Sequence, residues 1–158
     1  MKVTLSILKA DVGSIGGHTW PSTRMMEAAQ TAVKDAIAKG LLIDGFVSHT
    51  DDDIALLMSH TRGKDDTELH QFAWQTFLNA TAIAQKYRLY GAGQDLLVDA
   101  PSGNIRGAGP AVAELEFEHD PIKPNRIRPA ESFMMFAADK CGPGAYNLPL
   151  FLGLADPS

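Results

Sequence analysis

Residues 3–18 read V-T-L-S-I-L-K-A-D-V-G-S-I-G-G-H, and this stretch decides how the chain begins to fold. Apolar and polar side chains alternate over 3–10, with Val3, Leu5 and Ile7 on one face, as in a half-buried strand. The strand runs into a glycine-rich turn that starts at Asp11 and ends at His18. The stretch therefore predicts a strand and a tight turn that carry two kinds of polar ligand residue.

The apolar periodicity continues along the chain and predicts further elements. Helices are expected from Pro21–Ser22 to about Lys39 and from Asp66–Thr67 to about Arg88. Strands are expected at 41–48, 54–59, 111–118 and 132–138. This order predicts an α+β fold, a mostly antiparallel sheet with both helices packed on one face. The other face would need another layer, from a second half of the chain or from an oligomer partner.

The composition is that of one soluble globular domain, covering 1–158, with 45% apolar and 21% charged residues. A net charge of −5 argues against a general nucleic-acid binder, since phosphate backbones are held by clustered cations. The single cysteine, Cys141, cannot form an internal disulfide. No apolar run approaches the roughly 18 residues of a membrane span, and no signal-peptide pattern opens the chain. We therefore expect a cytoplasmic protein.

Aspartates stand where the expected strands end. Asp11 follows the first strand, and Asp51, Asp52 and Asp53 form the link between the second and third. Mg²⁺ prefers carboxylate oxygens, and rigid strand ends can aim several at one point. Adjacent aspartates point in different directions, so Asp52 and Asp53 could serve two ions, as in phosphoryl transfer. The alternative is ordinary turn chemistry, in which an aspartate run is simply solvated.

Other candidates are weaker when each is taken alone. The turn at 13–17 could hold a phosphate on backbone N–H groups, but it matches neither the dinucleotide nor the Walker A pattern. His18 could be a ligand or an ordinary surface residue. Asp139 and Lys140 follow the strand expected at 132–138 and could hold a metal and a phosphate, or form a surface salt bridge. The other histidines lack metal-site spacing and are interpreted as structural or solvated: His49, His60, His70 and His119.

A series of motifs occurs in order along nearly the whole chain. They are T-L-S-I-L-K-A-D-V-G-S-I-G-G-H (4–18), D-D (52–53), H-T-R-G (60–63), L-Y-G-A-G-Q-D-L-L (89–97), S-G-N (102–104), A-D-K (138–140) and P-G-A-Y-N-L-P-L (143–150). Together they resemble the fructose-1,6-bisphosphate aldolase/phosphatase family of archaea and deep-branching bacteria. An ordered set of this kind is far more specific than any one of its motifs.

The resemblance implies a bifunctional enzyme of gluconeogenesis with a layered α-β-β-α fold, working as a homo-oligomer. Such an enzyme condenses dihydroxyacetone phosphate with glyceraldehyde 3-phosphate, then removes the 1-phosphate of fructose 1,6-bisphosphate. The resemblance implies several Mg²⁺ ions, held by Asp11, His18, Asp52, Asp53, Gln94 and Asp139. It also implies substrate contacts from His18, Tyr90, Gly103, Asn104 and Lys140.

One departure from the family concerns length. Members of the family that the motifs resemble are more than twice as long, and the Schiff-base lysine of their aldolase step lies beyond the part matched here. We therefore expect 1–158 to be the N-terminal half of the family's catalytic domain, without Schiff-base residues. A binding module or regulatory fragment that holds metal and sugar phosphate without catalysis is the alternative. A phosphatase without aldolase activity is a third possibility.

Overall fold

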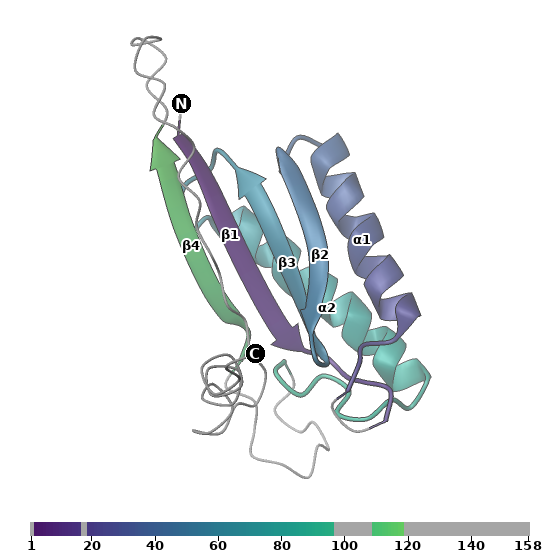
Figure 1. Ribbon diagram of the computed structural model, residues 1–158. Coiled ribbons are helices and arrows are strands. Elements are labelled where there is room, and N and C mark those ends of the chain that lie inside the picture. Colours follow the sequence, from purple (N-terminus) through teal and green to yellow (C-terminus); the bar gives the residue numbers. More distant parts are fainter. Residues whose placement is uncertain (1, 17–18, 97–108, 119–158) are drawn as a thin grey trace, which may run out of the picture.

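The computed structural model describes residues 2–16, 19–96 and 109–118 (Figure 1). The elements in this part of the chain are β1 (Lys2–Asp11), α1 (Thr23–Ala38), β2 (Asp44–Thr50), β3 (Asp53–His60), α2 (Thr67–Lys86) and β4 (Ala111–Glu118). The strands form a four-stranded sheet in the order β2-β3-β1-β4, and every neighbouring pair is antiparallel. The prediction of an α+β fold is confirmed. The strand expected at 132–138 lies outside the described residues.

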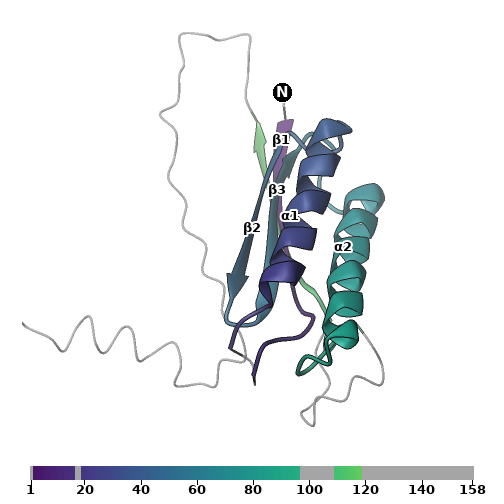
Figure 2. The same ribbon diagram turned by 90° about the vertical axis from the view of Figure 1, so that its right-hand side faces the viewer.

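Both helices lie on the same side of the sheet, as Figure 2 shows. Alternate residues of the two central strands, Leu8 in β1 and Leu56 in β3 among them, point to this side and are buried. They form one core with Met25 of α1 and Phe77 of α2. Ser22 and Asp66 cap the helices by accepting backbone N–H bonds from the first turns, at the positions that the sequence predicted. No helix among the described residues is long and apolar enough to cross a membrane.

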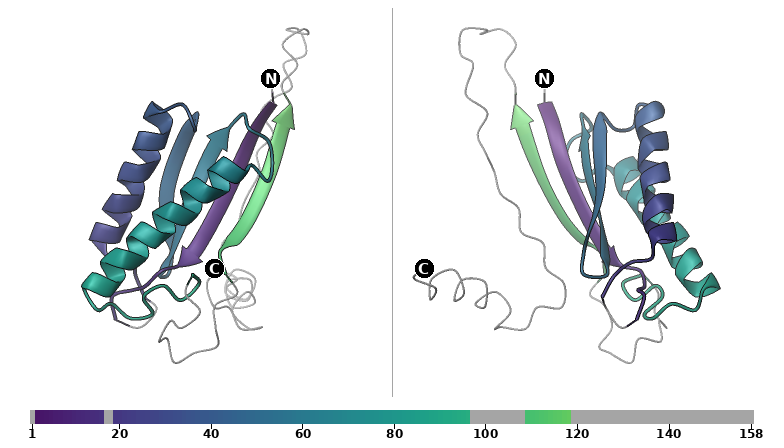
Figure 3. Two further views of the ribbon diagram at one scale, coloured as in Figure 1. Left: turned by 180° about the vertical axis from the view of Figure 1, so that it is seen from behind. Right: turned by 45° about the vertical axis from the view of Figure 1, so that its right-hand side comes forward.

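The opposite face of the sheet is apolar and is covered by no described helix (Figure 3). Leu5 lies beside Leu115 and Val3 beside Phe117 in the β1–β4 register. Leu115 and Phe117 are 48% and 43% exposed, and Phe46 in β2 is 65% exposed. An apolar face of this kind is normally buried against another layer. The second layer expected from the sequence stays a prediction.

The start of β2 was predicted wrongly, because Leu41 and Leu42 lie in the turn that closes the C-terminus of α1. The N–H of Leu41 donates to the carbonyl of Ala36, and the N–H of Gly40 donates to that of Ile37. These bonds, with Gly40 at φ 75°, form a Schellman motif. Leu42 is buried in the core beneath the helix, so its apolar character reflects helix packing and β2 begins only at Asp44.

A buried polar network ties β1, β3 and β4 together. The N–H of Arg62 donates to Nδ1 of His60, so the neutral imidazole carries its hydrogen on Nε2, which lies 2.8 Å from Ser6 Oγ. Ser6 in turn donates to Oε1 of Glu114 at 2.6 Å, and Nε2 of His70 lies 3.0 Å from the same oxygen. His60 is 1% exposed, so the interpretation of this histidine as structural is supported by its contacts.

We expect this network to make the free energy of unfolding depend on pH. Burial lowers the pKa of His60 from its ordinary 6.5, although the carboxylates of Glu114 and Asp66 act in the opposite direction. The unfolded chain therefore binds a proton at this histidine more strongly than the folded chain does. The free energy of unfolding should fall as the pH drops below 6.5.

Urea unfolding at pH values from about 8 to 5.5 measures this dependence. A His60→Gln variant should be less stable than the wild type at pH 8 and should lose much of the decline between pH 6.5 and 5.5. The matched control is His49→Gln, which changes a half-buried histidine outside the network and should keep the decline. If the free energy of unfolding of the His60 variant fell with pH as much as that of the wild type, His60 would not be the source of the pH dependence.

Candidate metal centre

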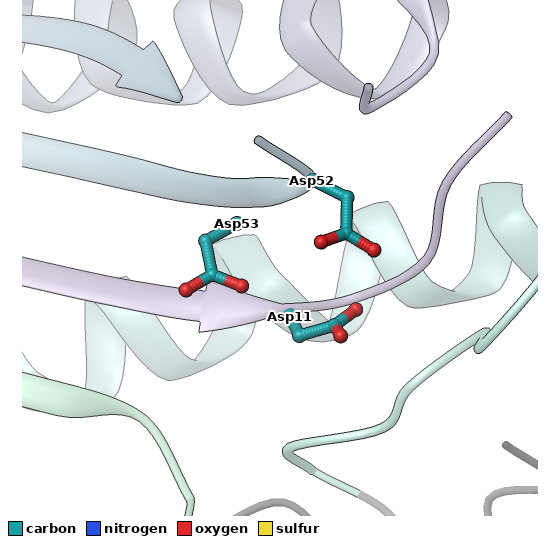
Figure 4. A group of neighbouring side chains, drawn as sticks. All are labelled: Asp11, Asp52 and Asp53. Carbon is teal, nitrogen blue, oxygen red and sulfur yellow. The ribbon is translucent and has the colours of Figure 1, made fainter. Parts of the chain in front are cut away.

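Three buried aspartates meet at one end of the sheet (Figure 4). Asp11 ends β1, Asp53 begins β3, and the two residues are register partners in the antiparallel pair. Asp52 lies in the turn between β2 and β3. One carboxylate oxygen from each residue lies within 4.8 Å of the others, and the residues are only 2%, 0% and 2% exposed in sequence order. The structure thus brings together three of the predicted metal ligands.

The turn conformation separates Asp52 from its neighbour Asp51. Asp51 takes a left-handed backbone with φ 46°, which aspartate tolerates better than most residues. Its side chain is exposed, whereas Asp52 is fully buried. Thr50 and Asp53 are register partners on either side of the turn. The two-residue tip therefore presents one aspartate to solvent and turns the next toward Asp11.

The segment after α2 is held against the end of β1. The N–H of Asp11 donates to Oδ2 of Asp95 at 2.8 Å, and the N–H of Asp95 donates to the carbonyl of Asp11 at 3.0 Å. The N–H of Gly93 donates to the carbonyl of Val12 at 3.0 Å. These bonds fasten residues 93–95 to the strand end that carries Asp11.

Two predicted site residues, Tyr90 and Gln94, lie in the segment after α2. Tyr90 exchanges two backbone hydrogen bonds with Ser14, of 2.8 and 3.1 Å, and its side chain is 41% exposed. Gln94 lies between Gly93 and Asp95 and is 7% exposed. Its Oε1 is buried and has no hydrogen-bond partner among the residues that the structure describes. A buried amide oxygen in this state is suited to accept a cation as its partner.

The clustered carboxylates repel one another. Two like charges 4.8 Å apart repel by about 3 kcal/mol at an effective dielectric constant of about 20. Lys9 forms an ion pair with Oδ2 of Asp53 and offsets part of this repulsion. A divalent cation among the three carboxylates would offset much more. The donor set is made of oxygen atoms, which suits a hard cation such as Mg²⁺, Ca²⁺ or Mn²⁺. The described residues therefore fit a metal of this class.

Several predicted residues cannot be placed. The proposed ligands His18 and Asp139, and the proposed substrate contacts Gly103, Asn104 and Lys140, lie outside the described residues. Their roles stay predictions.

Two residues of the site were missed by the sequence analysis. Lys9 precedes Asp11 by two positions and so lies on the same face of β1, which was a usable signal. Asp95 lies inside the L-Y-G-A-G-Q-D-L-L motif, but its bond to the backbone of Asp11 joins segments far apart in sequence. No local pattern predicts such a bond.

The chain is similar to proteins of a known family. A family model described as fructose-1,6-bisphosphatase matches residues 2–158. A Thermus thermophilus protein named fructose-1,6-bisphosphate aldolase/phosphatase is 53% identical over 157 residues, which are 99% of this chain and 41% of the relative. Proteins of the same name from Pyrobaculum neutrophilum and Moorella thermoacetica are 52% and 47% identical, each over 99% of this chain and 38% of the relative. The chain therefore spans less than half the length of these curated relatives.

Proposed function

Because the chain belongs to the fructose-1,6-bisphosphatase family, whose model matches residues 2–158, we propose that it supplies the metal-binding part of a fructose-1,6-bisphosphate aldolase/phosphatase. The observation that carries the proposal is the buried cluster of Asp11, Asp52 and Asp53. Relatives with the bifunctional name match 99% of the chain, which supports both activities for the complete protein. In this proposal the chain corresponds to the N-terminal half of the catalytic domain.

The metal that we propose is Mg²⁺, in more than one ion. Asp11, Asp52 and Asp53 would hold it with their carboxylates, and the amide oxygen of Gln94 is suited to join them. The family resemblance adds His18 and Asp139. When bound, Mg²⁺ would neutralise the negative charge of the phosphate and lower the pKa of a water molecule that it binds. The chain's own contribution is to fix the ligands on strand ends and to keep them buried.

The proposed substrate is fructose 1,6-bisphosphate, with dihydroxyacetone phosphate and glyceraldehyde 3-phosphate as substrates of the aldolase step. Tyr90 supports this assignment because it is exposed and lies near the metal centre. Its backbone is bonded to Ser14, which follows Asp11 by three residues. We propose His18, Gly103, Asn104 and Lys140 as further contacts to phosphate or sugar oxygens. We assign no Schiff-base residue within 1–158. The aldolase step is therefore proposed only for a protein that also contains the region of the relatives that this chain does not match.

Calorimetric titration with fructose 1,6-bisphosphate, with Mg²⁺ and with EDTA, tests the proposal. We expect binding that depends on Mg²⁺ and disappears with EDTA. Equal binding in EDTA would overturn the metal role. Release of inorganic phosphate in the same samples separates two functions. Turnover by the chain would make it a phosphatase in its own right, whereas binding without turnover would favour a binding part of a larger site. The second outcome is supported by the coverage of only 38–41% of the relatives.

A further inference from the structure

A pair of aromatic side chains joins the segment after β1 to the turn that carries Asp52. The indole of Trp20 packs on the imidazole of His49 in β2, with ring centroids 3.9 Å apart and planes tilted by 60°. Trp20 is 54% exposed and His49 is half-buried, so the pair lies at the surface and outside the main core. Among the residues that the structure describes, the indole of Trp20 therefore packs on His49 and not in the main core.

His49 holds the tip of the β2–β3 turn. Its Nδ1 lies 3.1 Å from the carbonyl oxygen of Asp51, and because a carbonyl only accepts, Nδ1 carries the hydrogen and donates it. Asp51 is the left-handed residue of the turn, with φ 46°. Left-handed backbone costs a non-glycine residue about 1 kcal/mol, so an outside contact helps to keep it. The residue that follows is the buried Asp52.

Trp20 is itself fixed by the loop that precedes it. Its carbonyl accepts the N–H of Ile15 at 2.9 Å, and the hydroxyl of Thr19 donates to the carbonyl of Ile15 at 2.7 Å. Ile15 follows Ser14, which is bonded to Tyr90. A continuous set of contacts thus runs from the Tyr90 segment, through the loop and the Trp20–His49 pair, to the Asp51 carbonyl.

We propose that Trp20 and His49 are positioning residues for the metal centre. The indole fixes the plane of the imidazole, and the Nδ1–H of the imidazole fixes the Asp51 carbonyl. The turn then keeps Asp52 directed at Asp11 and Asp53. This inference rests on the proposed metal-binding function, and the experiment below is arranged so that the two can fail separately.

The test is the affinity of the chain for Mg²⁺ alone, measured by calorimetry in the absence of sugar phosphate. His49→Phe keeps a ring and loses the donor, and it should weaken Mg²⁺ binding by about tenfold, the low end of the range for groups that orient metal ligands. Trp20→Ala should weaken binding to a similar extent. His49→Asn loses the ring that packs on Trp20 but keeps an amide donor near the position of Nδ1. It should therefore bind Mg²⁺ more tightly than His49→Phe and more weakly than the wild type, a partial rescue that a purely structural role of the ring would not give.

The matched control is Trp74→Ala. Trp74 is 42% exposed on α2, where it lines a surface pocket with Asp65 and His70, and the variant should bind Mg²⁺ as the wild type does. Unfolding temperatures in EDTA check that every variant folds. Trp20 and Trp74 are the only tryptophans of the chain, so Trp74→Phe leaves Trp20 as a fluorescent reporter. The fluorescence of Trp20 should change on addition of Mg²⁺, and the midpoint of this change should equal the midpoint measured by calorimetry.

The outcomes separate the two proposals. A wild-type chain that binds no Mg²⁺ would overturn the proposed function. A wild type that binds, with His49→Phe and Trp20→Ala binding equally well, would leave the metal centre intact and overturn the positioning role. An Asn variant as weak as the Phe variant would overturn the part assigned to the Nδ1 hydrogen bond.

Discussion

Replacement of Asp52 by alanine is expected to weaken Mg²⁺ binding by about a hundredfold or more, because it removes a carboxylate from the centre of the oxygen cluster. Asp51→Ala should leave the affinity within about threefold, since the Asp51 side chain is exposed and is not one of the three clustered carboxylates. Calorimetric titration of both variants with Mg²⁺ measures the difference. Phosphate release in the complete enzyme should follow the same order.

A third variant separates loss of a ligand from damage to the turn. Asp52→Asn has nearly the same shape but no charge, and it removes one member of a group of buried carboxylates that lie within 4.8 Å of one another. This variant should fold in EDTA, which its thermal unfolding transition checks, while its Mg²⁺ affinity falls as in Asp52→Ala. Equal loss of Mg²⁺ binding at positions 51 and 52 would mean that the turn as a whole, and not the specific ligand, is what matters.

The contrast between Asp51 and Asp52 shows which features of the site could be predicted from the sequence and which could not. Alternation along 3–10 and helical periodicity after Ser22 and Asp66 predicted β1, α1 and α2, because an element that is buried on one face has apolar residues at regular intervals. Turn chemistry taken alone favoured a solvated aspartate run over a metal-binding one. Which aspartate turns inward depends on the left-handed backbone of Asp51, and no composition rule predicts that conformation.

Two other residues show the same limit in different ways. Leu42 lies in an apolar run that fits a strand, but the run continues the burial of α1 past its Schellman motif. Periodicity could not distinguish the two readings over so few residues. Asp95 is placed by a bond to the backbone of Asp11, 84 positions earlier. Only a resemblance that spans the chain could place 89–97 in the same site as Asp11.

The segment that carries Gln94 depends on Gly13. This glycine has φ 124°, a backbone region that other residues rarely adopt. A Cβ at this position would lie 2.8 Å from the Cβ of Ala84 in α2, 3.1 Å from the Cα of Ala92 and 3.3 Å from the carbonyl oxygen of Tyr90. Two of these three atoms belong to backbone, which cannot move away as a flexible side chain would. The absence of a Cβ is therefore what lets the end of β1, α2 and the Tyr90–Gln94 segment lie so close together.

Gly13→Ala is accordingly expected to lower the free energy of unfolding by about 3 to 5 kcal/mol, from backbone strain and overpacking together. The control is Gly16→Ala. Gly16 also has a positive φ, 64°, but no atom of the described residues lies within 4 Å of an added Cβ, so the substitution should cost only about 1 kcal/mol. Urea unfolding in EDTA measures both. Variants that fold should differ in Mg²⁺ affinity as well, because moving residues 93–95 away from Val12 also moves Gln94. Equal losses of unfolding free energy in the two variants would contradict this explanation. Glycine would then be needed at position 13 only because of its φ, and not because the Gln94 segment packs closely against the end of β1.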